Sequence, residues 1–112
     1  MGPWIRAGAL LALAACGSMG CGHHARPQPV THTVTIEAVQ FQPAALTVRA
    51  GDTVVWVNKD PFPHTVTAAS GSPGSPDIAA SASWQWVASG SGDVAYVCKY
   101  HPTMKGIVTV AP

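Results

Sequence analysis

Apolar and polar residues alternate with a period of two through most of the chain after residue 31. Residues 33–38 place Val, Ile and Ala at even positions and Thr or Glu at odd ones, which is typical of a strand with one buried face. Phe41-Gln42-Pro43 interrupts this pattern, which resumes over residues 46–48 and ends at the turn residues Ala50-Gly51-Asp52. Residues 33–48 therefore predict two strands, interrupted at Phe41-Gln42-Pro43.

Two later segments, residues 53–58 and 94–98, are apolar at both odd and even positions, so we expect them inside a sheet rather than at its edge. Shorter strands are predicted over residues 64–68, 82–88 and 106–110. Seven or eight short strands, with turns about every 8 to 12 residues, predict an all-β sandwich. No window shows a helical period with helix caps.

The connections between these strands are rich in Gly, Pro and Ser. Lys59-Asp60-Pro61-Phe62-Pro63 is expected to be a rigid loop, because its two prolines fix φ and disfavour helix before them. Residues 70–77 form a turn-rich connection, which we expect to be the segment of the domain most tolerant of change.

The first fifteen residues have the pattern of an export signal. One positive charge, Arg6, precedes about nine small and apolar residues, a run too short to span a bilayer. The sequence Leu13-Ala14-Ala15-Cys16 resembles a bacterial lipobox, which implies that Cys16 becomes the lipid-carrying first residue on the periplasmic face of a membrane. The alternative is an ordinary cleaved signal, which would leave a soluble periplasmic protein.

Residues 16–30 follow the signal without any hydrophobic period, and we expect a flexible tether there. Cys21 and His23-His24 lie in this segment, where an adjacent pair of histidines is usually just solvated. The predicted folded domain spans residues 31–112.

Composition narrows the functional classes. Charged residues make up only 10% of the 112 residues and the formal net charge is +1, so the basic face that nucleic-acid binding requires is missing. The 11 Gly and 10 Pro accompany many Val, Thr, Trp and Ile, which argues against disorder. Three cysteines are too few for a disulfide framework.

The segment between the last two predicted strands carries the candidate chemistry. Cys98, His101 and Met104 recur there at steps of three residues, and His64 lies upstream between the Pro-rich loop and a strand. Taken singly, each has an ordinary explanation: a buried cysteine, a core methionine and a loop histidine. Together they form the ligand set that selects type 1 copper.

Physical chemistry explains why copper would suit this set. Cu(I) favours thiolate and thioether, whereas Cu(II) favours imidazole. A Cys98–His64–His101 plane with a weak bond to Met104 would therefore suit both oxidation states moderately. If a rigid sandwich held these ligands, an electron would move with little rearrangement of the site.

From Val39 to Val110 the chain resembles a cupredoxin of the plastocyanin, pseudoazurin and amicyanin group. The matching motifs are Phe41-Gln42-Pro43, residues 48–58, Pro63-His64-Thr65-Val66 and residues 92–98, and the short Cys-x2-His-x2-Met spacing is similar to that of amicyanin. The resemblance implies a Greek-key β-sandwich that carries one electron on one copper ion and is not an enzyme. Trp84-Gln85-Trp86 departs from the family pattern, which leaves the packing there open.

The resemblance also implies roles for residues around the ligands. Asn58 would tie the ligand loops together by hydrogen bonds, although it also simply ends a strand. His101, with Phe62, Pro63, Pro102 and Thr103, would form the surface where protein redox partners dock. Lys99 and Lys105 flank this loop and would favour an acidic partner. We expect a monomer.

Two other functions remain open at this point. A copper-trafficking or storage protein usually presents exposed Met/His clusters or paired cysteines, and His23-His24 is the exposed candidate here. A fragment of a copper oxidoreductase would need additional His-x-His ligand pairs, but the predicted domain contains only His32, His64 and His101. The carrier hypothesis therefore explains the residues best.

Overall fold

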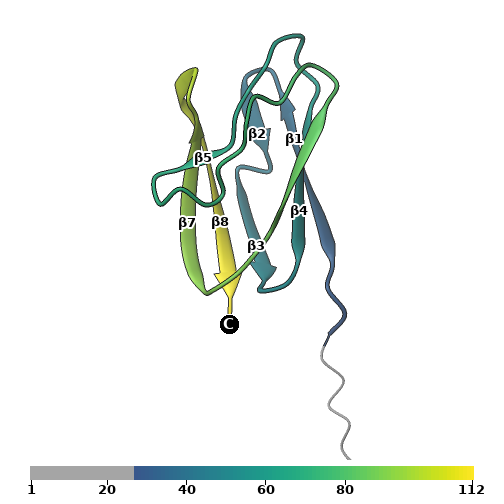
Figure 1. Ribbon diagram of the computed structural model, residues 1–112, viewed down its shortest axis with the longest axis vertical. Coiled ribbons are helices and arrows are strands. Elements are labelled where there is room, and N and C mark those ends of the chain that lie inside the picture. The colour runs from purple at the N-terminus through teal and green to yellow at the C-terminus, as the bar shows by residue number, and fades with distance from the viewer. Residues whose placement is uncertain (1–26) are drawn as a thin grey trace, which may run out of the picture.

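The computed structural model describes residues 27–112 of the 112-residue chain (Figure 1). The predicted signal peptide, Cys16, Cys21 and His23-His24 lie outside the described residues, so their roles stay predictions. The four residues before Thr31 are exposed and have no regular structure. Among the described residues there is no helix long and apolar enough to cross a bilayer.

Eight strands form two facing four-stranded sheets, which confirms the predicted all-β Greek-key sandwich. In chain order they are β1 Thr31–Glu37, β2 Gln40–Gln42, β3 Ala45–Arg49, β4 Thr53–Asn58, β5 Thr67–Ala68, β6 Ser83–Val87, β7 Gly92–Cys98 and β8 His101–Ala111. The order is β2-β1-β4-β6 in one sheet and β3-β8-β7-β5 in the other. The pairs β1–β4 and β3–β8 are parallel, and the other neighbouring pairs are antiparallel.

Most of the strand predictions are confirmed, and three need correction. β4 lies between β1 and β6, as expected from a segment that is apolar at both odd and even positions. β3 includes residues 46–48, where the alternating pattern is predicted to resume. The break predicted at Phe41-Gln42-Pro43 is wrong in part, because Gln40–Gln42 pairs with the end of β1 across a tight turn at Ala38 and Val39. The predicted strand over residues 64–68 is reduced to Thr67–Ala68, and His64 makes only an isolated bridge to Ile78.

The third correction concerns the segment that carries the candidate ligands. It is a hairpin rather than an open loop, since β8 begins at His101, which pairs with Cys98, and β8 pairs with β7 again from Lys105 to Val110 after a register shift. Only Lys99 and Tyr100 separate the two strands, and Cys98 lies opposite His101. Inter-strand pairing, which local sequence does not reveal, extends β8 five residues before the predicted start at Gly106.

Aromatic side chains fill the core between the sheets. The fully buried Trp56 of β4 donates its indole N–H to the hydroxyl of Tyr96 on β7, at 3.2 Å. The ring of Tyr96 also contacts Phe41 edge-on, with centroids 4.7 Å apart. Burial raises the pKa of Tyr96 to about 12, against the smaller opposing effect of the Trp56 hydrogen bond. These contacts join the two sheets below the ligand end of the molecule.

The departure at Trp84-Gln85-Trp86 is accommodated on the edge strand β6. Trp84 packs against Trp56 with ring centroids 5.8 Å apart. Trp86 donates its indole N–H to the Ser72 hydroxyl at 3.1 Å, and so attaches the turn-rich connection of residues 70–77 to the sandwich. Both tryptophans are partly buried and pack against the core of the two-sheet sandwich.

Candidate metal centre

Cys98 and His101 are brought together by the β7–β8 hairpin. Cys98 ends β7, His101 begins β8, and the two residues are partners across the turn, with a register irregularity at Val97/Cys98. The Cys98 side chain is fully buried, whereas His101 is partly exposed. The hairpin thus presents a buried sulfur and a half-buried imidazole at one end of the sandwich.

His64 reaches the same place from the loop after β4. Its backbone forms two hydrogen bonds with Ile78, N–H to carbonyl at 3.2 Å and carbonyl from N–H at 2.8 Å, which fix the position of the residue outside any longer strand. The side chain is fully buried. His64 is therefore both buried and held by backbone hydrogen bonds, although it lies outside the strands.

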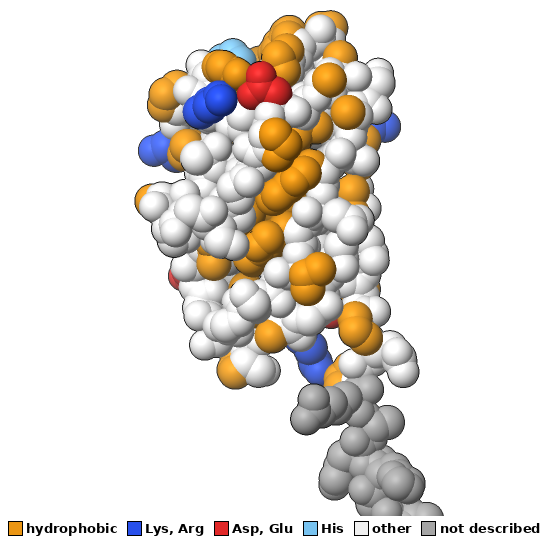
Figure 2. Space-filling model, in the orientation of Figure 1, with side chains coloured by type: hydrophobic (Ala, Val, Ile, Leu, Met, Phe, Trp, Pro, Cys, Tyr) orange, Lys and Arg blue, Asp and Glu red, His pale blue; other side chains and the backbone are white. Residues whose placement is uncertain are grey.

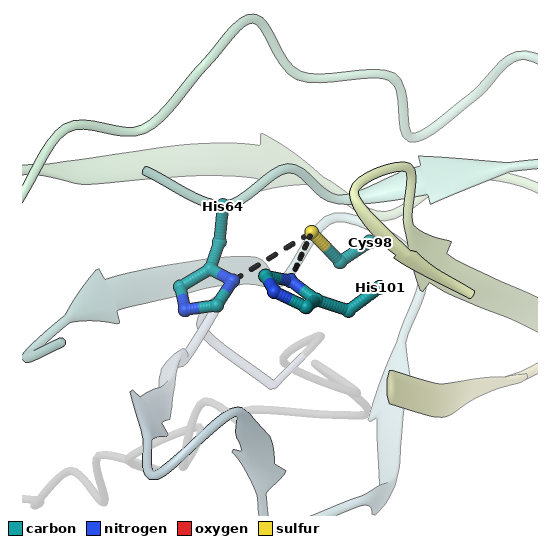
Figure 3. A group of neighbouring side chains, drawn as sticks. All are labelled: His64, Cys98 and His101. Atoms are coloured by element: carbon teal, nitrogen blue, oxygen red, sulfur yellow. Dashed lines mark hydrogen bonds between the residues drawn. The ribbon is translucent and has the colours of Figure 1, made fainter. Parts of the chain in front are cut away.

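The three side chains point their donor atoms at one another (Figure 3). Cys98 Sγ lies 3.6 Å from His64 Nδ1 and 3.9 Å from His101 Nδ1. Bonds of about 2.3 Å to sulfur and about 2.0 Å to nitrogen, as zinc makes, separate two donors by about 3.7 Å at an angle of 120°. The three donors therefore fit one first-row metal ion between them, and one thiolate with two imidazoles is a donor set that suits copper.

Thr65 fixes the sulfur from the opposite side. Its backbone N–H donates to Cys98 Sγ at 3.4 Å, and its hydroxyl oxygen accepts the Lys99 N–H at 3.0 Å. An N–H donor stabilises a thiolate, the form in which cysteine binds metals. Thr65 thus links the His64 segment directly to the ligand hairpin.

Asp60 holds the outer edge of the His64 ring. Its Oδ2 lies 2.8 Å from His64 Nε2, and the carboxylate also accepts the backbone N–H groups of Ala38 and Val39 at 2.7 and 2.9 Å. Burial of Asp60 opposes its ionisation, but these two amides and His64 together outweigh burial and hold the pKa of the carboxyl below its usual range. The imidazole therefore lies between an anionic oxygen and the sulfur of Cys98.

Asn58 stabilises the loop rather than the hairpin. Its side-chain amide donates to the carbonyls of Phe62 and Ile78 at 2.8 and 2.9 Å, and its oxygen accepts the Asp60 N–H at 2.9 Å. Within the described residues these bonds connect the two segments that flank His64. Asn58 therefore shapes the loop that delivers His64, while Thr65 makes the connection to Cys98.

Met104 lies on β8, three residues beyond His101. Its side chain is buried and belongs to the hydrophobic core cluster. Among the His, Cys, Asp and Glu side chains of the described residues, the close group of donor atoms consists of His64, Cys98 and His101. The assignment of Met104 as the fourth ligand stays a prediction.

The surface over the site is apolar. Phe62 covers both imidazoles, with its ring centroid 5.2 Å from His64 and 6.0 Å from His101. Phe62 and Tyr100 are among the most exposed large hydrophobic residues of the described chain, at 39% and 47%. Figure 2 shows a histidine at the end of the molecule opposite the C-terminus, with hydrophobic side chains beside it and a basic and an acidic side chain just below.

Sequence reasoning missed Asp60 and Thr65. Thr65 stands next to His64, and Asp60 stands four residues before it, but each also fits an ordinary local role, in a strand or in a Pro-rich loop. The signal that identifies them is the donor or acceptor each supplies to a ligand, and it appears only when distant segments meet.

Comparisons with known proteins agree with this arrangement. The family model of the cupredoxin-like domain matches residues 8–110. Amicyanin-alpha of Methylorubrum extorquens is 31% identical over 93% of this chain and 94% of its own length. The chain belongs to the cupredoxin family.

Other relatives place this cupredoxin within the family. Amicyanin of Paracoccus denitrificans is 30% identical over 69% of this chain and 63% of its own length. The solved structure of a methionine-to-alanine mutant of amicyanin in its Cu(I) form has a TM-score of 0.67 and 28% identity, covering 71% of this chain and 81% of that one. The protein is a type 1 blue copper protein of the amicyanin and plastocyanin group.

Membership in this group confirms several predictions at once. Copper is the cofactor, its role is copper-based electron transfer, and the protein is an electron carrier rather than an enzyme.

Proposed function

We propose that this cupredoxin is a monomeric periplasmic carrier that moves one electron at a time on a copper ion held by His64, Cys98, His101 and Met104. The observation that carries the proposal is the convergence of a fully buried sulfur and two imidazole Nδ1 atoms, at 3.6 and 3.9 Å from that sulfur. When bound, copper supplies the one-electron couple.

The protein's part is to keep these donors in place. Cys98 and His101 are fixed by antiparallel pairing, and His64 by two backbone hydrogen bonds to Ile78. Met104 is buried on the strand that begins at His101, which supports its assignment as the weak fourth ligand. Because the side chains are held by the fold, they need not move far when the oxidation state changes.

The partner surface is proposed around His101, which is the partly exposed ligand of the three. Phe62, Pro63, Pro102 and Thr103 are exposed around it, and Tyr100 adds a further exposed ring. Such a surface excludes water from a contact while bringing a partner close to a ligand. The predicted preference for an acidic partner is weakened at Lys99, since its ammonium lies 3.5 Å from the Asp77 carboxylate.

The location is proposed from the amino-terminal sequence. The export signal and the Leu13-Ala14-Ala15-Cys16 motif support attachment to the periplasmic face of a membrane through a lipid on Cys16. A soluble periplasmic protein is the alternative. A Cys16→Ser variant distinguishes them, because it would move the folded protein from the membrane fraction to the soluble one only if Cys16 carries the anchor.

Burial of the donors favours the carrier over a trafficking or storage protein. A trafficking site must pass its metal to another protein, which requires accessible donors, whereas Cys98 and His64 are both fully buried. A carrier should retain copper in the presence of a competing chelator and give a reversible one-electron wave. Rapid loss of Cu(I) without such a wave would support trafficking instead.

The deciding experiment is to load the protein with copper and record its visible and electron paramagnetic resonance spectra. We expect an intense thiolate-to-copper band that disappears in Cys98→Ser. The matched control is Cys21→Ser, which removes a thiol outside the predicted site and should keep the band. Retention of the full band in Cys98→Ser, or its absence from the unaltered protein, would refute the ligand assignment.

A further inference from the structure

Asp60 is the one carboxylate in the described part of the chain that touches a proposed ligand. Its side chain is buried beside the fully buried His64. Oδ2 lies 2.8 Å from His64 Nε2 and also accepts the Val39 N–H, while Oδ1 accepts the Ala38 N–H. The carboxylate therefore connects the ligand loop to the turn between β1 and β2.

This contact determines which ring nitrogen of His64 carries the proton. An ionised carboxylate only accepts hydrogen bonds, so His64 Nε2 must be the protonated nitrogen that donates to Asp60. The lone pair of Nδ1 is then directed toward Cys98 Sγ, 3.6 Å away. The tautomer needed for metal binding is thus set by the protein itself.

The other two contacts of Asp60 hold a strained turn. Ala38 and Val39 have φ angles of 54° and 57°, in the left-handed region that residues with a Cβ, and above all β-branched ones, seldom adopt. Their N–H groups converge on the same carboxylate, which offsets the cost of this conformation. Asp60 is in turn held by its own N–H, which donates to Asn58 Oδ1 at 2.9 Å.

We propose that Asp60 is a positioning residue that lowers the reduction potential of the copper site by presenting a fixed anionic acceptor to His64. The proposal rests on the assignment of His64 as a copper ligand. A negative charge at Nε2–H makes the imidazole a stronger donor, and stronger imidazole donation favours Cu(II) over Cu(I). Because the turn, the loop and Asn58 all hold the carboxylate, its distance to the ring is set by the fold.

The test compares Asp60→Asn with Asp52→Asn, both in the copper-loaded full chain. Asp52 accepts two backbone amides and contacts His32 Nε2 in the same way, at the other end of β4. Asp60→Asn removes the negative charge while keeping a side-chain oxygen, and mutation of the outer partner of a ligating histidine typically weakens metal binding by about 10- to 100-fold. If the loss falls on Cu(II), a tenfold change raises the potential by about 59 mV.

We therefore expect a higher reduction potential in Asp60→Asn than in the unaltered protein, and an unchanged reduction potential in Asp52→Asn. In Asp60→Glu, which restores the negative charge, the potential should return part of the way to its original value. Equal potentials in Asp60→Asn and Asp52→Asn would overturn the proposal while the unaltered protein keeps its thiolate-to-copper band. Absence of that band from the unaltered protein would instead overturn the ligand assignment.

A second measurement does not depend on the variant folding. In the copper-free, unaltered protein, nitrogen-15 magnetic resonance reports which ring nitrogen of each histidine is protonated. We expect His64 to be protonated at Nε2. A proton at Nδ1 of His64 would show that Asp60 does not select the tautomer, and would overturn the proposal.

Discussion

Two aspartate–histidine pairs lie at opposite ends of β4, one at the copper site and one remote from it. Asp52 precedes the strand and contacts His32 Nε2 at 2.9 Å, and Asp60 follows the strand and contacts His64 Nε2 at 2.8 Å. Each carboxylate also accepts two backbone N–H groups, those of Val30 and Arg49 for Asp52 and those of the β1–β2 turn for Asp60. The two ends therefore share one structural device.

What differs is the environment of the other side of the imidazole. The His64 side chain is fully buried and its Nδ1 faces the sulfur of Cys98, whereas the His32 side chain is 24% exposed. A carboxylate that accepts two backbone N–H groups lies at both ends, and at the copper end it also contacts the proposed metal ligand His64. The same aspartate–histidine contact therefore occurs at both ends of β4, and only at the copper end does the other ring nitrogen of the histidine face a cysteine sulfur.

The largest effect is expected when the two histidines are exchanged for alanine in turn. His64→Ala removes one of three converging donors, so the copper-loaded variant should lose the intense visible band entirely. His32→Ala leaves all predicted ligands in place and should keep the band. The visible spectra of the two copper-loaded variants provide the test. Loss of the band in His32→Ala would contradict the conclusion that only the His64 end of β4 contributes to the copper site.

A smaller effect is expected on acid stability when Asp52 is changed. The N–H of Val30, followed by His32 and the N–H of Arg49, lowers the pKa of Asp52 from 3.8 to about 2. Between these two pKa values the unfolded chain binds the proton more readily than the folded chain. The contribution of Asp52 to the free energy of unfolding is therefore fully present above about pH 4 and is lost as the pH falls toward 2. Asp52→Asn should lack this acid-sensitive part of the unfolding free energy.

Denaturant titrations of the copper-free protein from about pH 5 to about pH 2.5 measure that difference. Asp93→Asn is the control, because it removes the same charge from an exposed position that contacts Thr109. We expect Asp93→Asn to lose unfolding free energy on acidification just as the original protein does. If Asp52→Asn kept it as well, the bonds around Asp52 would not be the source of its acid sensitivity.

Much of the architecture follows from local pattern, because strands with one or two buried faces leave a direct mark on the sequence. The apolar character of residues 53–58 indicates a central strand, and β4 is one. The spacing of Cys98 and His101, with His64 after a Pro-rich loop, is likewise visible in the sequence, and the fold brings their donors together. Steric and hydrophobic requirements of this kind act over a few residues and can be recognised there.

The rest depends on contacts between distant segments. Gln40–Gln42 is mostly polar and becomes a strand because β1 pairs with it. Asp60, between a lysine and a proline, has the local pattern of an ordinary turn residue, yet its partners Ala38 and Val39 lie 22 and 21 residues earlier in the chain. No local pattern records which amide a carboxylate will meet, so this part of the site was not predictable.

The smallest effect concerns the core between the two ends, which should respond in stability but not in colour. Tyr96→Phe keeps the ring that contacts Phe41 and Trp56 but removes the acceptor of the Trp56 indole N–H. A buried donor left without a partner costs about 1–3 kcal/mol, so the urea midpoint of the copper-free protein should fall with little change in slope. Tyr100→Phe, which removes an exposed hydroxyl bonded to Asp77, is the matched control and should cause no comparable loss. Equal midpoints for the two variants would mean that the indole finds another partner, and the link between the sheets would then rest on ring packing alone.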